Sequence, residues 1–250
     1  MDFTQKKYKE LIEQLLNRGY SFQKFEEFVS KPEQKVVVLR HDVDKLPKNA
    51  IDLAIIESNL GIAASYYYRI VKQSNNPLLI EKVRDMGHEI GYHYEDLTLA
   101  KGDRKLAIKM FEENLNYFRK FYDVRTACMH GSPLSKWDNR LIWENYNYQD
   151  FGIIAEPYFD IDYNEVFYIT DTGRNWNNVS VSVRDKVDSG FSIKVNNTSH
   201  LIELSEQNLL PDKIIINTHP QRWFNPGIGW LKEFVLQNIK NQAKKLLIKR

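Results

Sequence analysis

The sequence predicts an α/β fold in which seven apolar strands alternate with amphipathic helices and form a parallel sheet, closed or nearly closed into a barrel. The first observation behind this prediction is the alternation itself, which runs from residue 35 to residue 218 without a linker or a shift in composition. The second is that most of the apolar runs end in an acidic residue or a histidine. The carboxyl ends of the strands share one face of such a barrel, and that face carries the active site.

The elements follow from the spacing of apolar residues. An opening helix is expected over 5–18, where the apolar side chains recur at helical spacing and Gly19 ends the pattern. The strands are expected at 35–41, 63–70, 88–93, 124–129, 151–155, 166–170 and 213–218. The helices are expected at about 48–59, 77–86, 103–121, 137–146 and 230–248. Residues 172–200 mix Asn, Ser and Asp with short β-branched runs and predict a loop-and-hairpin insertion. We expect residues 1–250 to form one domain with its barrel core at about 35–220.

The composition is that of an ordinary globular protein, with 42% hydrophobic and 27% charged residues. A net charge of +2 and a pI near 8.4 are too mild to indicate a nucleic acid partner. The first residues lack the apolar core of a secretory signal, and no apolar run approaches the roughly 18 residues that span a membrane. We therefore expect a cytoplasmic protein, in which the sequon at 178–180 has no role.

The last helix ends in a cluster of basic residues, Lys240, Lys244, Lys245, Lys249 and Arg250. A solvated face explains such a cluster, and weak contact with a membrane surface is the alternative. The sequence does not indicate an oligomeric state.

Residues 36–44, Val-Val-Val-Leu-Arg-His-Asp-Val-Asp, form the run around which the chain is organised. The β-branched part predicts a buried parallel strand. Period-2 alternation places Asp42 and Asp44 on the same side, where two like charges favour a cation between them. The alternative is that one aspartate caps the helix that begins near Pro47.

Three of the six histidines, His93, His130 and His219, follow apolar runs in equivalent positions. One aspartate and two imidazoles satisfy a catalytic metal that keeps an open position for water. Zinc is the expected ion, and cobalt, nickel or manganese would also suit such ligands. The lone Cys128 excludes a cysteine-rich zinc site and is expected in the core. His41 alternates away from Asp42, and His88 begins its strand at the opposite end of the barrel, where a structural role is expected.

The segment Gly-His-Glu-Ile-Gly-Tyr-His at 87–93 resembles the second motif of the polysaccharide deacetylase family, which is also known as the NodB homology or carbohydrate esterase family 4 (CE4). His-Asp-Val-Asp at 41–44 is similar to a variant of its first motif. The resemblance covers roughly residues 35–220. It implies a distorted (β/α)7 barrel and a metal-dependent amidase that acts on N-acetylated sugars.

The resemblance also implies roles for single residues. Asp42 aligns with the catalytic base, and Asp44, one place later than usual, is assigned as a metal ligand. His93 matches the first histidine of the second motif, but Leu97 stands where the second belongs. His130 is expected to supply the missing imidazole, with Glu95 and Asp96 as alternatives. His219 resembles the late histidine that acts as general acid.

Other site residues are less well defined by the motifs. The arginine that orients the base is absent from the third motif, and Arg174, Arg69 or Arg184 is expected to replace it. The expected substrate contacts lie in the loops at the site face and are Tyr94, Glu95, Trp137, Arg174 and Trp223. No nucleophile elbow surrounds Ser132, so a serine nucleophile is not expected.

These residues predict a metal-dependent hydrolase that removes an N-acetyl or related N-acyl group from a sugar. The expected substrate is a small or lipid-linked intermediate of surface-polysaccharide synthesis. One alternative is a catalytically silent barrel that binds a glycan or a partner, because a motif histidine and an arginine are missing. Another is hydrolysis of a different carbon–nitrogen bond, as in a formamide or a cyclic amide.

Overall fold

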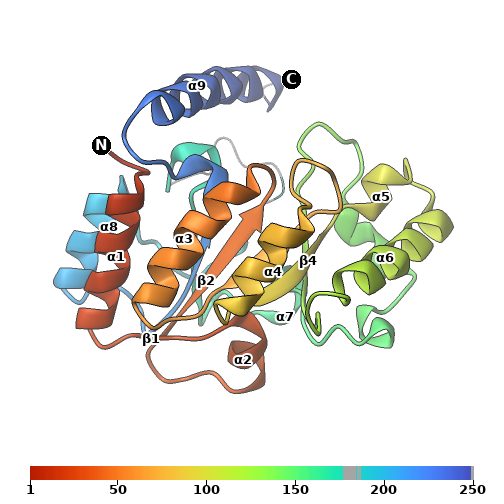
Figure 1. The fold of residues 1–250 in the computed structure, drawn as a ribbon, viewed down its shortest axis with the longest axis horizontal. Coiled ribbons are helices and arrows are strands. Elements are labelled where there is room, and N and C mark those ends of the chain that lie inside the picture. The colour runs from red at the N-terminus through yellow and green to blue at the C-terminus, as the bar shows by residue number, and fades with distance from the viewer. Residues whose placement is uncertain (177–183, 185–186, 249–250) are drawn as a thin grey trace.

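The protein is built around one curled sheet of parallel strands (Figure 1). The computed structural model describes residues 1–176, 184 and 187–248. The strands are β1 (Ser21–Phe22), β2 (Val36–Val43), β3 (Ser65–Tyr68), β4 (Glu89–Tyr94), β5 (Ala127–Met129), β6 (Phe167–Thr170) and β7 (Lys213–Thr218). Their order is β5-β4-β3-β2-β7-β6, with β1 beside the start of β2, and every pair is parallel.

Strand β2 is central and is buried along its whole length. A strand covered on both faces needs the continuous apolar run that opens β2. One of its edges pairs with β1 at Val36 and Val37 and then with β3 from Arg40 to Val43. The other edge pairs with β7 from Val36 to His41. The carboxyl end of β2 therefore lies between the ends of β3 and β7.

Helices cover the outer face of the sheet, where α1, α3 and α4 lie side by side and α6 lies beyond β4 (Figure 1). The α-helices are α1 (Gln5–Asn17), α2 (Phe25–Ser30), α3 (Pro47–Asn59), α4 (Pro77–Asp85), α5 (Asp96–Leu99), α6 (Arg104–Phe118), α7 (Pro157–Asp160), α8 (Thr198–Glu206) and α9 (Ile228–Ile248). The 3₁₀ helices are η1 (Asn139–Glu144), η2 (Tyr148–Phe151), η3 (Thr172–Arg174) and η4 (Pro220–Arg222). No helix in the described ranges is both long and apolar enough to cross a membrane.

Alternation along β2 divides the core into two parts. Val37 and Leu39 pack in the large cluster between the sheet and the outer helices. Val36 and Val38 point to the concave side, in a smaller cluster that Phe25 of α2 closes at the amino-terminal end of the strands. Successive side chains of a strand point to opposite faces, so Arg40 and Asp42 continue the concave set.

The predicted fold class is confirmed, since parallel strands and helices form a half-barrel of the distorted (β/α) type. Among the described residues, the hydrogen-bonded order does not return from β6 to β5. The strand expected at 151–155 is reduced to one bridge between Thr126 and Ala155.

The helix expected at 137–146 was wrong in type, because the chain forms the short 3₁₀ helices η1 and η2 instead. Asp138 and Asn147 each accept a hydrogen bond from the backbone two residues ahead, which starts a new short turn at each. The hairpin expected within 172–200 has no strand in its described part, which contains η3 and the start of α8. The sequon at 178–180 lies outside the described residues.

Candidate active site

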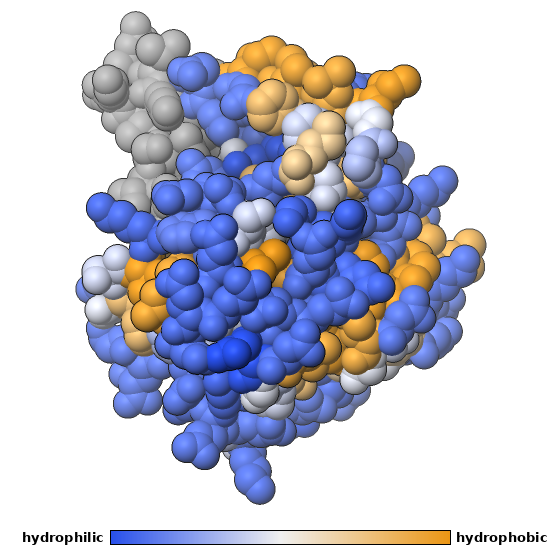
Figure 2. Space-filling view, turned by 90° about the vertical axis from the view of Figure 1, so that its left-hand side faces the viewer, coloured by the Kyte–Doolittle hydropathy of each residue, from blue (hydrophilic) through white to orange (hydrophobic). Residues whose placement is uncertain are grey.

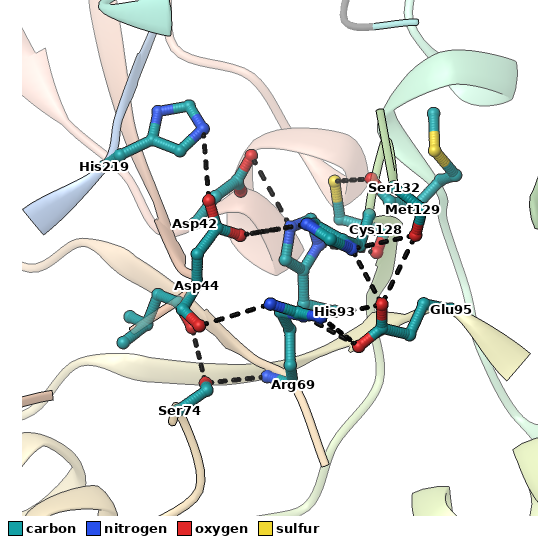
Figure 3. A network of polar contacts seen from close by, with 12 residues as sticks. Asp42, Asp44, Arg69, Ser74, His93, Glu95, Cys128, Met129, Ser132 and His219 are labelled. Atoms are coloured by element: carbon teal, nitrogen blue, oxygen red, sulfur yellow. Dashed lines mark hydrogen bonds and ion pairs between the residues drawn. The ribbon is translucent and has the colours of Figure 1, made fainter. Parts of the chain in front are cut away.

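Polar side chains from four strand ends gather at the carboxyl edge of the sheet (Figure 3). Asp44 follows β2, His93 lies on β4, His130 follows β5 and His219 follows β7. Buried parallel strands bring these positions together from distant parts of the sequence. The predicted grouping of polar residues at one end of the barrel is therefore present in the structure.

Three ligand atoms converge at the centre of this edge. Asp44 Oδ1 lies 3.6 Å from His93 Nε2 and 3.4 Å from His130 Nε2. Two donors that each lie about 2.1 Å from a tetrahedral metal ion are roughly 3.4 Å apart. The spacing of Asp44, His93 and His130 thus suits a shared divalent ion.

The other ring nitrogens show how the two imidazoles are held. His93 Nδ1 lies 2.9 Å from the carbonyl oxygen of Cys128, and His130 Nδ1 lies 2.9 Å from Glu95 Oε2. Both partners only accept, so each Nδ1 carries the proton and each Nε2 turns its lone pair toward Asp44. Asp44 Oδ1 is buried and has no hydrogen-bond partner in the described part of the chain. A cation would satisfy all three atoms.

The ionised form of Asp44 is also favoured when no ion is bound. Burial alone would raise the pKa of Asp44, but the neighbouring imidazoles of His130, His93 and His219, when they are protonated, hold it well below its usual value. The carboxylate therefore stays ionised at the rim of the sheet, as a ligand for a divalent ion must.

Asp42 lies deeper than Asp44 and is fixed by a buried arginine on the same strand. Arg40 Nε lies 3.1 Å from Asp42 Oδ1, and Arg40 NH2 lies 2.9 Å from Oδ2. Asn217 Nδ2 donates to Oδ2 at 3.0 Å. The guanidinium is fully buried, with its carbon 5.5 Å from the ring centroids of Tyr158 and Tyr168.

Arg40 was not among the residues predicted to orient the base. None of the three predicted arginines has a described contact with Asp42. Arg69 binds Glu95 through Nε and NH2 at 2.7 and 2.8 Å. Arg184 donates to backbone carbonyls of the loop at 131–135. Arg174 lies over the rings of Phe3, Trp230 and Phe234. The signal for Arg40 was its two-residue spacing from Asp42 on an extended strand.

His219 is held by Asp171, the residue that follows β6. His219 Nδ1 lies 2.7 Å from Asp171 Oδ1, and His219 Nε2 lies 3.9 Å from Asp44 Oδ2. Arg222 NH1 lies 2.5 Å from Asp171 Oδ1, and Trp223 Nε1 donates to Oδ2 at 2.7 Å. Arg222 NH1 also lies 2.7 Å from His219 Nδ1. These two nitrogens are neighbours because both donate to the same oxygen, Asp171 Oδ1.

These contacts overcome the cost of burying Asp171. Burial would raise the pKa of Asp171, but the Arg222 guanidinium and His219 lower it. The ionised carboxylate fixes the imidazole so that Nε2 faces the site.

Two of the residues predicted to contact the substrate, Tyr94 and Trp223, are too deeply buried to reach it. Tyr94 is fully buried and faces the outer helices, because alternation along β4 points it away from His93. Its hydroxyl accepts a hydrogen bond from Trp143 Nε1 at 2.9 Å. Trp223 is also fully buried, with its indole N–H on Asp171. Tyr94 therefore packs in the core beneath the site, and Trp223 holds Asp171 in place.

Two other predicted contacts have different surroundings. Trp137 is half-buried and packs so closely on Gly102 that an added Cβ there would lie 2.3 Å from the indole. Glu95 is buried between Arg69 and His130, so it orients the imidazole. Leu97, which stands in the place of the missing motif histidine, is buried in the outer core. Asp96, an alternative to His130 as the ligand, accepts a hydrogen bond from the Tyr92 hydroxyl at 2.8 Å. His130 is the alternative that lies beside Asp44.

A second set of ligand-type atoms, from Asp42, His93 and Cys128, also lies within range of a metal ion. Arg40 and Asn217 already bind the carboxylate of Asp42. The set that contains Asp44 is therefore the better ligand set.

The opposite face of β2 carries a separate buried network. His41 Nε2 lies 2.7 Å from Glu57 Oε1 of α3, and His41 Nδ1 lies 2.6 Å from Thr218 Oγ1. Tyr66 donates to Glu57 Oε2 at 2.7 Å. His41 thus ties the strand ends that carry Asp42 and His219 to the outer helices. His88 is buried nearby and accepts a hydrogen bond from the backbone N–H of Ala64.

The fold and site together define a class: an α/β half-barrel with a candidate metal centre of one carboxylate and two imidazoles at its carboxyl edge. No protein-family profile and no curated protein sequence matches the chain. Solved structures do match it, and they include a peptidoglycan deacetylase and CE4 proteins, the family that the sequence motifs resemble.

The peptidoglycan deacetylase PdaC from Bacillus subtilis is 13% identical, with a TM-score of 0.41 over 88% of this chain and 98% of that one. A CE4 family pseudoenzyme from Bacillus anthracis is 13% identical, with a TM-score of 0.44, and the match covers 85% of this chain and 62% of the pseudoenzyme. The Xyl-CE4 domain of a xylanase from the hindgut metagenome of Trinervitermes trinervoides is 17% identical, with a TM-score of 0.38 over 85% of both chains. With TM-scores below 0.5, the roles assigned below rest on the geometry of the site itself.

Proposed function

We propose that the chain is a divergent polysaccharide deacetylase, a metal-dependent hydrolase that removes an N-acetyl or related N-acyl group from a sugar. The observation that carries this proposal is the convergence of Asp44 Oδ1, His93 Nε2 and His130 Nε2. Asp42 Oδ2 lies 3.9 Å from His93 Nε2, and His219 Nε2 lies 3.9 Å from Asp44 Oδ2. The motif resemblance at 41–44 and 87–93 supports the substrate class, which includes small and lipid-linked sugars.

Asp44, His93 and His130 would hold one divalent ion, with zinc expected and cobalt, nickel or manganese also suited. Such an ion would polarise an acyl oxygen and lower the pKa of water. Behind the ligands, Cys128 O and Glu95 fix the ring orientations. The protein thus holds its ligands in place before an ion binds.

Asp42 acts as the general base in this proposal. Its carboxylate is held by Arg40 and Asn217, and its Oδ2 lies 3.9 Å from His93 Nε2. Asp42 takes a proton from water as the water oxygen adds to the acyl carbon. The carbon–nitrogen bond then breaks, and His219 gives the proton on its Nε2 to the departing amine. The products are a carboxylic acid and a free amino sugar.

The test compares metal content with hydrolysis in the purified protein. Hydrolysis of N-acetylated and N-formylated nucleotide sugars is measured with and without a chelator. His130→Ala should lose both metal and activity. His200→Ala is the matched control, because His200 lies on α8 with its Nδ1 on the backbone N–H of Asn196. Hydrolysis that survives chelation, or full metal content in His130→Ala, would overturn the proposal.

Variants of the two aspartates distinguish the proposed metal ligand, Asp44, from the proposed general base, Asp42. Asp44→Asn should weaken metal binding, since a neutral amide replaces the anionic ligand. Asp42→Asn should keep the metal while the rate falls by roughly 10²–10⁴, the usual worth of positioned proton transfer. A protein that binds the metal but hydrolyses none of the acylated sugars would instead be a silent, glycan-binding barrel.

A further inference from the structure

Helix α9 turns a polar face toward the rest of the protein. Glu233, Gln237 and Asn241 recur every four residues and form this face, and Glu233 and Gln237 are buried. Glu233 Oε2 lies 3.4 Å from Lys45 Nζ. Asn241 Nδ2 donates to the carbonyl of Gly173 in η3 at 2.8 Å. The helix is therefore attached beside the site, since Lys45 follows Asp44 and η3 follows β6.

The opposite face of α9 is apolar and exposed. Ile228, Leu231, Val235 and Ile239 are 87%, 56%, 47% and 60% exposed, and their spacing of three, four and four residues places them on one side of the helix. Figure 1 shows α9 along the outside of the molecule, and Figure 2 shows an apolar band at that end. A surface helix of a globular protein normally has the reverse orientation, with its apolar face inward. The apolar face of α9 has no cover within the described part of the chain.

Charge identifies what would cover it. Residues 228–250 contain six basic residues and one acidic residue, a net charge of +5. The whole chain carries +2, so residues 1–227 carry −3. Lys232 and Lys240 are exposed on α9. A second copy of the chain is a poor match, because a two-fold interface would place the same basic helix against itself. An anionic surface complements both the charge and the apolar face.

We propose that α9 docks the protein on an anionic membrane surface. The apolar face would lie in the boundary between headgroups and acyl chains, with lysines near the lipid phosphates. The helix would lie in the plane of the membrane and hold the carboxyl edge of the sheet near it. If the proposed function also holds, this position favours lipid-linked N-acylated sugars over free ones. Membrane docking itself does not depend on catalysis.

Vesicle binding of the full chain tests the proposal. Co-sedimentation is measured with vesicles of phosphatidylcholine alone and with an equal mixture of phosphatidylcholine and phosphatidylglycerol. We expect binding to the mixed vesicles and its loss at high salt. Absence of binding to the mixed vesicles, or equal binding to both, would overturn the proposal.

Two sets of variants test the face itself. Leu231→Ser, Val235→Ser and Ile239→Ser together should weaken vesicle binding by roughly tenfold or more. The matched control combines Leu78→Ser, Leu106→Ser and Leu209→Ser, which are exposed apolar residues outside α9. Lys232→Gln with Lys240→Gln should weaken binding by about 25-fold, at about fivefold per lysine. Lys105→Gln with Lys109→Gln on α6 is the control for charge.

The controls and the oligomeric state decide the outcome. Equal losses in the α9 variants and their controls would show that the face is not specific. Sedimentation analysis without vesicles completes the test. A wild-type dimer that the α9 variants convert to a monomer would assign the face to a second copy and overturn the membrane proposal. Loss of vesicle binding with unchanged sugar hydrolysis would separate this inference from the proposed function.

Discussion

Arg40 and Asp42, two residues apart on β2, form a two-point ion pair inside the curled sheet, at 3.1 and 2.9 Å. Both side chains are buried, and the positive charge is enclosed by the rings of Tyr158 and Tyr168. Two hydrogen bonds from one guanidinium hold the carboxylate of Asp42 in a single orientation, whereas an aspartate without such a partner could rotate. Arg40 is therefore a positioning residue for the proposed base.

Removal of Arg40 should cost both stability and rate. Arg40→Met leaves the charge of Asp42 buried without its partner, so the free energy of unfolding should fall by roughly 3–5 kcal/mol. Arg40→Met combined with Asp42→Leu should recover most of that loss without recovering activity, because an apolar pair replaces an ion pair of similar volume. Urea unfolding of the single and double variants gives both values. If Arg40→Met kept full stability, the pair would not be coupled as described.

The Asp171–His219 pair leads to a second prediction. Asp171→Asn should keep the metal content and lower kcat by roughly 10²–10⁴, because the imidazole is no longer held for proton transfer. KM should change less than kcat. Asp138→Asn is the control, because Asp138 is also a carboxylate bound to an arginine, at 2.7 Å from Arg140 NH2. Equal loss of kcat in both variants would remove the special role of Asp171.

Glu89, at the amino-terminal end of β4, makes stability depend on pH. Burial raises the pKa of Glu89 from 4.5 to about 7, against hydrogen bonds from Ser65 and Thr126. The folded state therefore holds a proton that the unfolded state releases as the pH rises above 4.5. The stabilising contribution is complete below that pH and is lost as the pH rises through about 7.

Glu89→Gln removes this titration and tests it. The variant should be more stable than the wild type at pH above 7, by up to about 3 kcal/mol. The difference should shrink as the pH falls toward 4.5. Thermal unfolding of both proteins across this range is the measurement, because the difference between them cancels the other titrating groups. A constant difference at all pH values would contradict the prediction.

Gly91 gives a prediction about packing next to His93. A Cβ added at Gly91 would lie 2.3 Å from the ring of Tyr67 on the concave side. Gly91→Ala should therefore lower the free energy of unfolding by about 1–3 kcal/mol through overpacking. Gly131→Ala is the control, because its added Cβ would meet only Arg184 Cβ at 3.8 Å. Comparable unfolding midpoints for the two variants would show that the Tyr67 ring moves aside freely.

The sequence was sufficient to predict most of the sheet, because β-branched runs that end in polar residues mark buried parallel strands. Asp44, His93 and His130 could be grouped for the same reason, since the carboxyl ends of neighbouring strands meet. Their roles as ligands, and those of Asp42 and His219 in proton transfer, stay predictions. The prediction that all residues form one domain also stays a prediction.

Other features depend on contacts that spacing along the chain does not report. Arg40 lies in an apolar run, and only the three-dimensional enclosure by Tyr158 and Tyr168 shows how its charge is accommodated. Tyr94 is expected from the sequence in a loop at the site face, but it lies on β4, where alternation turns it outward. The inverted orientation of α9 is set by Glu233 and Asn241, whose partners lie far away in the sequence.

The two faces of β2 make this strand intolerant of changes in length. Odd and even positions serve different neighbours: His41 bonds to Glu57 of α3 and to Thr218 of β7, whereas Arg40 and Asp42 lie on the concave side. Deleting one residue between Val36 and Arg40 would shift the register and exchange the two sets. The carboxylate of Asp42 would then face Glu57, and the imidazole of His41 would enter the site. Evolution can therefore vary the loops after this strand more freely than the number of residues within it.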